Sequence, residues 1–211
     1  AFLRRGAHRP RYQEDGHTIA SELPNPRSIS NALNGHPRKL GHRGLSDFHM
    51  FWGIFLIFDI TLTPSNASDP LPYSVPRCDK FYDFDCRGDV TINFKRTKRT
   101  VINGVREQTT GTSSLLDGSS VYGSHAQRAG VLRSRQDGKL LIGSDRELPL
   151  NEQRVKMRGD PANQLRLCGD ERGNLLPTIT AINTLLLREH NRRCDVLRGQ
   201  HPDWDDEKLY Q

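Results

Sequence analysis

Residues 113–124 read Ser-Ser-Leu-Leu-Asp-Gly-Ser-Ser-Val-Tyr-Gly-Ser and form the most informative stretch of this 211-residue chain. The segment from Gly118 to Gly123 predicts a tight turn, and Ser124 can cap a helix that continues to Arg133. Residues 113–119 follow the alternating pattern Ser-x-Leu-x-Asp-x-Ser. Its oxygens would come from two hydroxyls, one carboxylate and the backbone carbonyl of the leucine. An extended loop of this kind can present several oxygens to a hard cation, although the same pattern usually forms only a helix-capping turn.

Apolar patterning on either side of this loop predicts helices. The longest apolar run, Met50 to Ile60, is about half of the roughly 20 residues that a membrane-spanning helix needs, so no membrane span is expected. Asp47 can cap a helix through this run, which is apolar nearly all round and is therefore expected to be buried. A modest helix is expected over 106–116. The best amphipathic helix begins at Thr178 and carries one stripe of Ile179, Ile182, Leu186, His190, Cys194 and Leu197.

The fold class predicted from these patterns is mainly α with long loops. Residues 1–44 are rich in Pro, Gly, Arg and His and are expected to form an extended arm. Residues 45–211 are expected to form a mostly helical body.

The charge balance is basic, with 31 Lys and Arg against 25 Asp and Glu. The only dense basic cluster, residues 95–99, lacks interleaved aromatic residues and is expected to be a solvated loop. The predicted partners therefore exclude nucleic acid.

Two local features favour an oxidising, extracellular compartment. Cys78 and Cys86 flank a short polar segment, so a loop-closing disulfide is a candidate. Asn66 begins the glycosylation sequon Asn-Ala-Ser directly after a proline, where a surface loop is expected.

Several strings together resemble the animal haem peroxidase family, in order and at sensible spacing. They cover residues 23–33, 59–64, 106–108, 113–124 and 184–192. The resemblance implies that residues 1–211 are the distal, N-terminal portion of one haem peroxidase-like domain. Three further strings make the chain most similar to the peroxidase-homology domain of dual oxidases: residues 78–89, 171–174 and 201–207.

The resemblance also implies that the polar distal positions have been replaced. A typical family member carries Gly-Gln-Phe-x-Asp-His-Asp on the distal helix, where the chain has residues 53–59. Phe58 occupies the position of the catalytic histidine and cannot carry a proton. The halide-site glutamine position is Ile54, and the two haem-ester positions are Ile57 and Leu175.

Arg172 is the one distal catalytic residue that the resemblance retains. It could stabilise negative charge on bound peroxide, or it could tie its loop to carboxylates such as Asp170. The family's proximal iron ligand lies beyond residue 211. Haem b is therefore expected only with that missing half, and only without covalent esters.

The calcium positions of the family are, by contrast, retained. By resemblance the ligands are Asp59, Ser113, Leu115 through its carbonyl, Asp117 and Ser119. Ca²⁺ is thus the expected cofactor.

The function implied is a catalytically degenerate, calcium-stabilised extracellular module, located outside the cell or on the outer face of the plasma membrane. Its partner would be the remainder of the peroxidase-like domain or another protein subunit. The alternative is a haem-dependent peroxidase that reduces hydrogen peroxide, in the response to oxidative stress, through a non-standard distal site with Arg172.

Overall fold

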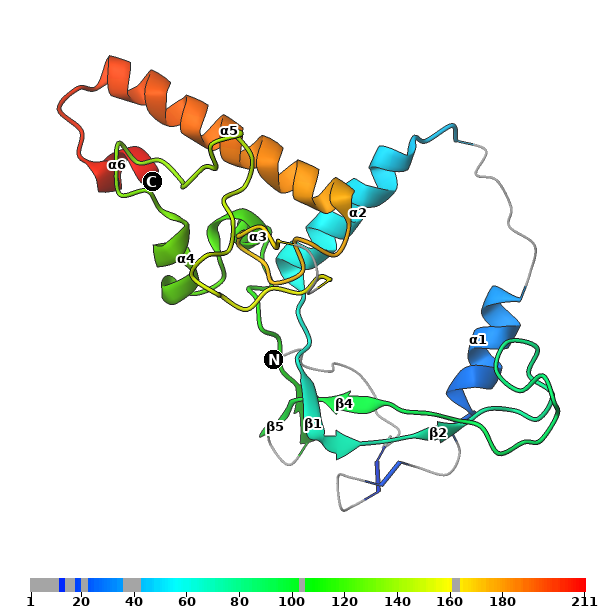
Figure 1. Cartoon of the computed structure of the whole chain (residues 1–211). Coiled ribbons are helices and arrows are strands. Elements are labelled where there is room, and N and C mark those ends of the chain that lie inside the picture. The colour runs from blue at the N-terminus through cyan, green and yellow to red at the C-terminus, as the bar shows by residue number, and fades with distance from the viewer. Residues whose placement is uncertain (1–11, 14–17, 20–22, 36–42, 103–104, 161–163) are drawn as a thin grey trace. The chain divides into compact units, whose positions relative to one another are not determined.

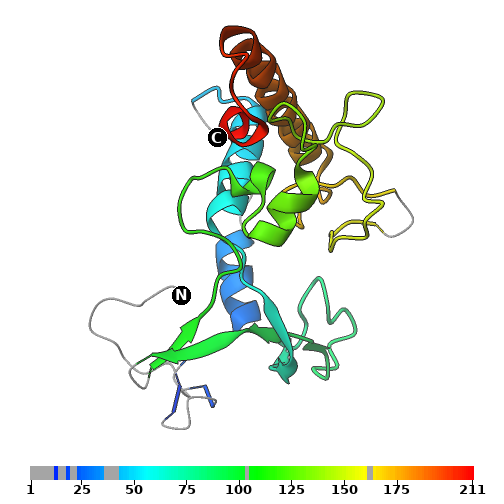
Figure 2. The ribbon, with the colours of Figure 1, turned by 90° about the vertical axis from the view of Figure 1, so that its left-hand side faces the viewer.

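The computed structural model divides the chain into two compact units, each described here by itself (Figures 1 and 2). The described residues are 12–13, 18–19, 23–35, 43–102, 105–160 and 164–211. Unit 1 comprises Ala1–Arg43 and Thr63–Thr110, and unit 2 comprises Gly44–Leu62 and Gly111–Gln211. Residues 63–110 therefore group with the N-terminal residues, which differs from the expected division into an arm and a helical body.

Unit 1 is built mainly from short strands. Its described elements are α1 (Pro26–Asn34), β1 (Ser65–Pro70), β2 (Tyr73–Ser74), β3 (Thr91–Ile92), β4 (Lys95–Thr97), β5 (Arg99–Ile102) and β6 (Val105–Gln108). The strands pair antiparallel as β1–β4, β2–β3 and β5–β6. The prediction of a helix over 106–116 is wrong. Residues 105–108 form β6, which pairs with β5 from Arg99↔Gln108 to Ile102↔Val105.

Helix α1 lies within the segment expected to be extended. Asn25 caps it, because the Asn25 side chain accepts hydrogen bonds from the backbone N–H groups of Arg27 at 2.8 Å and Ser28 at 3.2 Å. Pro26 occupies the first turn, where its missing N–H costs nothing.

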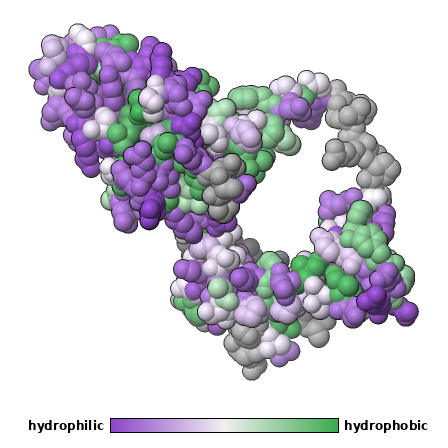
Figure 3. Space-filling model, in the orientation of Figure 1, coloured by the Kyte–Doolittle hydropathy of each residue, from purple (hydrophilic) through white to green (hydrophobic). Residues whose placement is uncertain are grey.

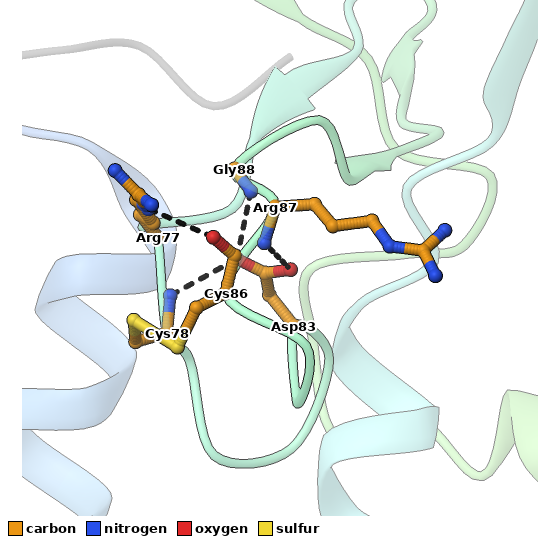
Figure 4. The surroundings of a disulfide bond; sticks show 6 residues. All are labelled: Arg77, Cys78, Asp83, Cys86, Arg87 and Gly88. Atoms are coloured by element: carbon orange, nitrogen blue, oxygen red, sulfur yellow. Dashed lines mark hydrogen bonds between the residues drawn. A yellow bond between two sulfur atoms is a disulfide. The ribbon is translucent and has the colours of Figure 1, made fainter.

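A disulfide between Cys78 and Cys86 closes a loop in unit 1, as predicted (Figure 4). The buried carboxylate of Asp83 accepts hydrogen bonds from the backbone N–H groups of Cys78, Arg87 and Gly88 at 3.0, 3.0 and 2.9 Å. Burial alone would raise the pKa of Asp83, but these three donors outweigh it and hold the pKa below its usual range. The loop is thus fixed by a covalent bond and by an internal anion.

The basic cluster at 95–99 is not a solvated loop. Lys95–Thr97 form β4, and the buried guanidinium of Arg96 pairs with the buried carboxylate of Asp69, which also lies 3.3 Å from Arg106. Strand pairing turns one cation of the cluster inward, where a carboxylate neutralises it.

Unit 2 is helical, with long irregular segments between its helices. Its described helices are α2 (Asp47–Ile60), α3 (Ser119–Tyr122), α4 (Ala126–Leu132), α5 (Pro177–Gln200) and α6 (Asp206–Tyr210). The fold class is therefore mainly α with long loops, as predicted. The core gathers around α5 and consists of Phe55, Val121, Leu132, Leu140, Leu148, Leu167, Cys168, Ile179, Ile182 and Leu187.

Helix α2 is only partly covered, although its composition predicts burial on all sides. Phe55 and Asp59 are its buried residues, on the side that packs against α3 and α5. Phe48, Met50 and Ile57 remain 58%, 56% and 53% exposed. Figure 3 shows apolar side chains gathered over this helix. None of the helices within the described ranges is long and apolar enough to cross a membrane.

Candidate functional site

Asp59 joins the end of α2 to the start of α3. Its carboxylate accepts hydrogen bonds from the backbone N–H groups of Gly118 at 3.0 Å and Ser120 at 2.8 Å. The hydroxyl of Ser119 donates to the carbonyl oxygen of Asp59 at 3.1 Å and lies 3.2 Å from its carboxylate. Asp59 is 3% exposed, and its carboxylate accepts hydrogen bonds from N–H groups at the beginning of α3 that would otherwise be unsatisfied.

The loop before α3 links three of the other predicted calcium ligands, Ser113, Asp117 and Ser119, by hydrogen bonds. Asp117 accepts a hydrogen bond from the backbone N–H of Ser119 at 3.1 Å, and the Ser113 hydroxyl accepts one from Leu115 N–H at 3.1 Å. Burial alone would raise the pKa of Asp117, but hydrogen bonds from Ser113 and Ser119 outweigh it and lower the pKa. The loop carboxylate and two hydroxyls thus lie with the Asp59 carboxylate of α2 around the N-terminus of α3.

These oxygens suit a hard cation in type, and two carboxylates would balance the charge of Ca²⁺. Asp59 and Asp117 are the only carboxylates in the set, and the described residues contain no cluster of three or more His, Cys, Asp or Glu side chains arranged to hold a metal. Any cation here would therefore depend on hydroxyl and carbonyl oxygens for its remaining ligands.

Arg172 lies against Phe58, so the structure brings together the two distal positions that the sequence singles out. The guanidinium carbon of Arg172 is 4.1 Å from the centre of the Phe58 ring, and its Nη2 donates to the Phe58 carbonyl at 2.9 Å. The Asp170 carboxylate accepts from the Arg172 backbone N–H at 2.7 Å, from Nε at 2.8 Å and from Nη2 at 2.7 Å. Both side chains of this ion pair are nearly buried.

A glycine allows the segment with Asp170 and Arg172 to approach α3 closely. A Cβ atom at Gly169 would lie 2.5 Å from the carbonyl oxygen of Ser119 and 2.6 Å from that of Ser120. The next residue, Asp170, donates its backbone N–H to the Ser120 carbonyl at 3.2 Å. Arg172 is therefore fixed from its backbone outward.

The other predicted distal positions are apolar and lie at or near the surface. Ile57 is 53% exposed, Leu175 is 46% exposed and Ile54 is half-buried against the core. Because none of these side chains carries a carboxylate, none can form an ester with haem.

Both ring nitrogens of His190 have hydrogen-bond partners. Its Nε2 donates to the Gly138 carbonyl at 2.9 Å, so its Nδ1 can accept from the Tyr122 hydroxyl at 3.2 Å. Burial lowers the pKa of His190 and favours this neutral form. His49 is exposed and lies nine residues before Phe58 on α2, roughly 13 Å along the helix axis. The sequence did not predict the hydrogen bond between Tyr122 and His190, although Tyr122 lies within the string 113–124.

Comparison with known proteins decides the family. The family model for animal haem peroxidases matches residues 3–211. The chain belongs to the animal haem peroxidase family. It is 32% identical to Peroxinectin A of Dictyostelium discoideum over 95% of the chain and 41% of that protein. It is 34% identical to human Dual oxidase 1 over 90% of the chain and 13% of that protein.

Solved structures agree with this family assignment. Peroxidase A from Dictyostelium discoideum superimposes with a TM-score of 0.81 at 30% identity, covering 94% of the chain and 43% of that structure. A fatty acid alpha-dioxygenase from Oryza sativa superimposes with a TM-score of 0.65 at 26% identity, covering 83% of the chain and 26% of that structure. The peroxidase-homology chain thus spans less than half the length of the relatives that it matches.

Proposed function

We propose that this chain is a catalytically degenerate member of the animal haem peroxidase family that serves as a calcium-stabilised extracellular module. The observation that carries this proposal is the state of Arg172. In a working distal site this cation would face peroxide beside a histidine. Here its guanidinium packs on the Phe58 ring and donates to Asp170 and to a backbone carbonyl.

The residues present do not fit peroxide chemistry. General acid–base catalysis needs a group that takes a proton from peroxide and returns it, and Phe58 offers none. The Asp170 carboxylate holds the Arg172 charge, which would otherwise be available to stabilise a developing anion. Haem esters are excluded by Ile57 and Leu175, so we derive no reaction step through haem.

Calcium is the cofactor that we propose for the loop at 113–119. The support is the convergence of Asp59, Asp117 and the two serine hydroxyls at the start of α3. A bound cation would stabilise the junction between α2 and α3, which Asp59 already holds by hydrogen bonds.

The proposed compartment is extracellular, or the outer face of the plasma membrane. The disulfide between Cys78 and Cys86 supports an oxidising environment, and the sequon at Asn66 is consistent with a glycoprotein. The proposed partner is the remainder of a peroxidase-like domain or another subunit, which would cover the exposed apolar side of α2.

The absorption spectrum of the chain with haemin, before and after addition of hydrogen peroxide, tests the loss of catalysis. We expect no turnover of a peroxidase substrate, with or without a Soret band. A Soret band that shifts with peroxide, together with turnover of a peroxidase substrate, would overturn the proposal. That result would establish the alternative, a haem-dependent peroxidase with a non-standard distal site.

Thermal unfolding with calcium or a chelator tests the proposed cofactor. A ligand at 100 times its Kd stabilises the folded state by about 2.7 kcal/mol, which raises the Tm of a chain of this size by roughly 5–10 °C. Asp117→Asn should remove this increase, whereas Asp203→Asn, at an exposed carboxylate elsewhere in unit 2, should retain it. Equal unfolding temperatures with calcium and with chelator would contradict a calcium site.

A further inference from the structure

The excess positive charge of the chain belongs to one unit. Unit 1 contains 16 Lys and Arg against 9 Asp and Glu, whereas unit 2 contains 15 against 16. The net charge of +6 therefore arises from +7 on unit 1 and −1 on unit 2. An electrostatic partner of this chain would be attracted to unit 1.

Burial increases this imbalance at the surface of unit 1. Four of the six carboxylates among its described residues are buried, namely Asp69, Asp79, Asp83 and Glu107. Asp69 pairs with Arg96, and Asp79 pairs with Arg27 at 2.7 Å. Seven cations remain exposed, namely Arg43, Arg77, Lys80, Arg87, Lys95, Lys98 and Arg99. Only two carboxylates, Asp85 and Asp89, are exposed beside them within the described part of the unit.

The disulfide loop adds exposed aromatic rings to these cations. Phe81, Tyr82 and Phe84 are 62%, 51% and 77% exposed, although aromatic side chains of this size are usually covered. The Nζ atom of Lys80 lies 5.7 Å from the centre of the Phe81 ring, and the Cζ atom of Arg27 lies 4.8 Å from the centre of the Tyr82 ring. The loop presents apolar rings beside the exposed Lys80 and beside Arg87, which pairs with the exposed Asp85 at 3.0 Å.

The disulfide loop is held by a covalent bond and by several internal hydrogen bonds. The disulfide closes the loop, Asp83 accepts three of its backbone N–H groups, and the Arg77 side chain donates to the Cys86 carbonyl at 2.7 Å (Figure 4). Asp79 accepts hydrogen bonds from Phe81 N–H at 2.9 Å and from Asn31 at 2.8 Å, which fixes the loop to α1. A surface ordered in advance loses little conformational entropy on binding.

We infer that unit 1 binds a sulfated polysaccharide through the disulfide loop and the exposed lysines of the 95–98 segment. Sulfate groups would pair with the cations, and the less polar faces of the sugar rings would pack on the exposed aromatic rings. A single-stranded nucleic acid could use the same two features. The disulfide favours the polysaccharide, because it indicates an oxidising compartment, where sulfated polysaccharides are abundant and nucleic acids are scarce.

Titration of the oxidised chain with heparin, followed by calorimetry, tests this inference without haem or calcium. By the rule for counter-ion release, four ion pairs should weaken binding about 100-fold between 50 and 200 mM NaCl. The variant with Lys80, Arg87, Lys95 and Lys98 all replaced by Gln should bind at least tenfold more weakly and show a smaller salt dependence. The control variant replaces four exposed cations of unit 2 by Gln, namely Arg135, Arg154, Arg192 and Lys208, and should bind like the unsubstituted chain.

A second variant separates the rings from the charges. Phe81→Ser with Phe84→Ser should weaken heparin binding several-fold and leave its salt dependence unchanged, since these rings carry no charge. Far-UV circular dichroism would check that each variant keeps its fold. Absence of heparin binding at 50 mM NaCl, or equal losses in the two fourfold variants, would overturn the inference. Tighter binding of single-stranded DNA of matched charge would overturn it in favour of a nucleic-acid site.

Discussion

Removal of the Asp170 carboxylate should destabilise unit 2 strongly, because it leaves the Arg172 guanidinium buried without its anion. Three hydrogen bonds of 2.7–2.8 Å join the two residues, and Asp170 is 5% exposed and Arg172 is 9% exposed. Breaking a buried pair by removing one partner costs about 3–5 kcal/mol. We therefore expect this loss in the free energy of unfolding for Asp170→Ala, and a similar loss for Arg172→Met.

The double variant, Asp170→Ala with Arg172→Met, should cost less than the sum of the two single variants, by about 2 kcal/mol. Urea unfolding followed by tryptophan fluorescence would measure these values, because both tryptophans, Trp52 and Trp204, lie in unit 2. Asp145→Ala, which removes a more exposed partner of Arg166, is the matched control and should change stability far less. A loss below about 1 kcal/mol for Asp170→Ala, or additive single losses, would refute the view that this ion pair holds Arg172 in place.

Three further predictions concern stability and modification. Cys78→Ser with Cys86→Ser should destabilise unit 1 by about 2.5 kcal/mol on the chain-entropy model, measured as faster hydrogen exchange in residues 63–110, and unchanged exchange would contradict this. Burial lowers the pKa of His190, so the unfolded chain binds protons first and stability should fall as pH drops below about 6.5. His190→Gln should flatten that part of the pH–stability curve, and an unaltered curve would assign the effect to other groups. Asn66→Gln should remove one glycan when the protein is made in a secretory pathway, and an unchanged mass after glycosidase treatment of the unsubstituted chain would show that the sequon is unused.

The sequence predicts the two longest helices of unit 2 well, because each depends on local signals. The apolar run after Asp47 and the amphipathic stripe after Thr178 form α2 and α5. The ion pair between Arg172 and Asp170 is one of the two alternatives that the sequence predicts for this arginine, since the two residues lie two positions apart. Its packing on Phe58, 114 positions earlier, could not be predicted from spacing alone.

The expectations that failed involve competing signals or missing contacts. Pro24-Asn25-Pro26 suggests a turn, yet the same asparagine and Pro26 are a helix cap and a first-turn proline for α1. The dipeptide Asn103-Gly104 is a hairpin signal in the sequence, and β5 and β6 pair on either side of it. The apolar composition of α2 predicts burial, but burial also requires covering surface, and the chain spans less than half the length of its relatives.

The last turn of α2 directs two adjacent side chains to two different segments of unit 2. Successive helical residues point about 100° apart, so position 58 faces Arg172 while Asp59 faces the start of α3. A substitution at 58 can therefore change the contact with Arg172 and leave the hydrogen bonds of Asp59 to α3 untouched. The two adjacent positions can thus vary independently, one at the contact with Arg172 and the other at the junction of α2 and α3.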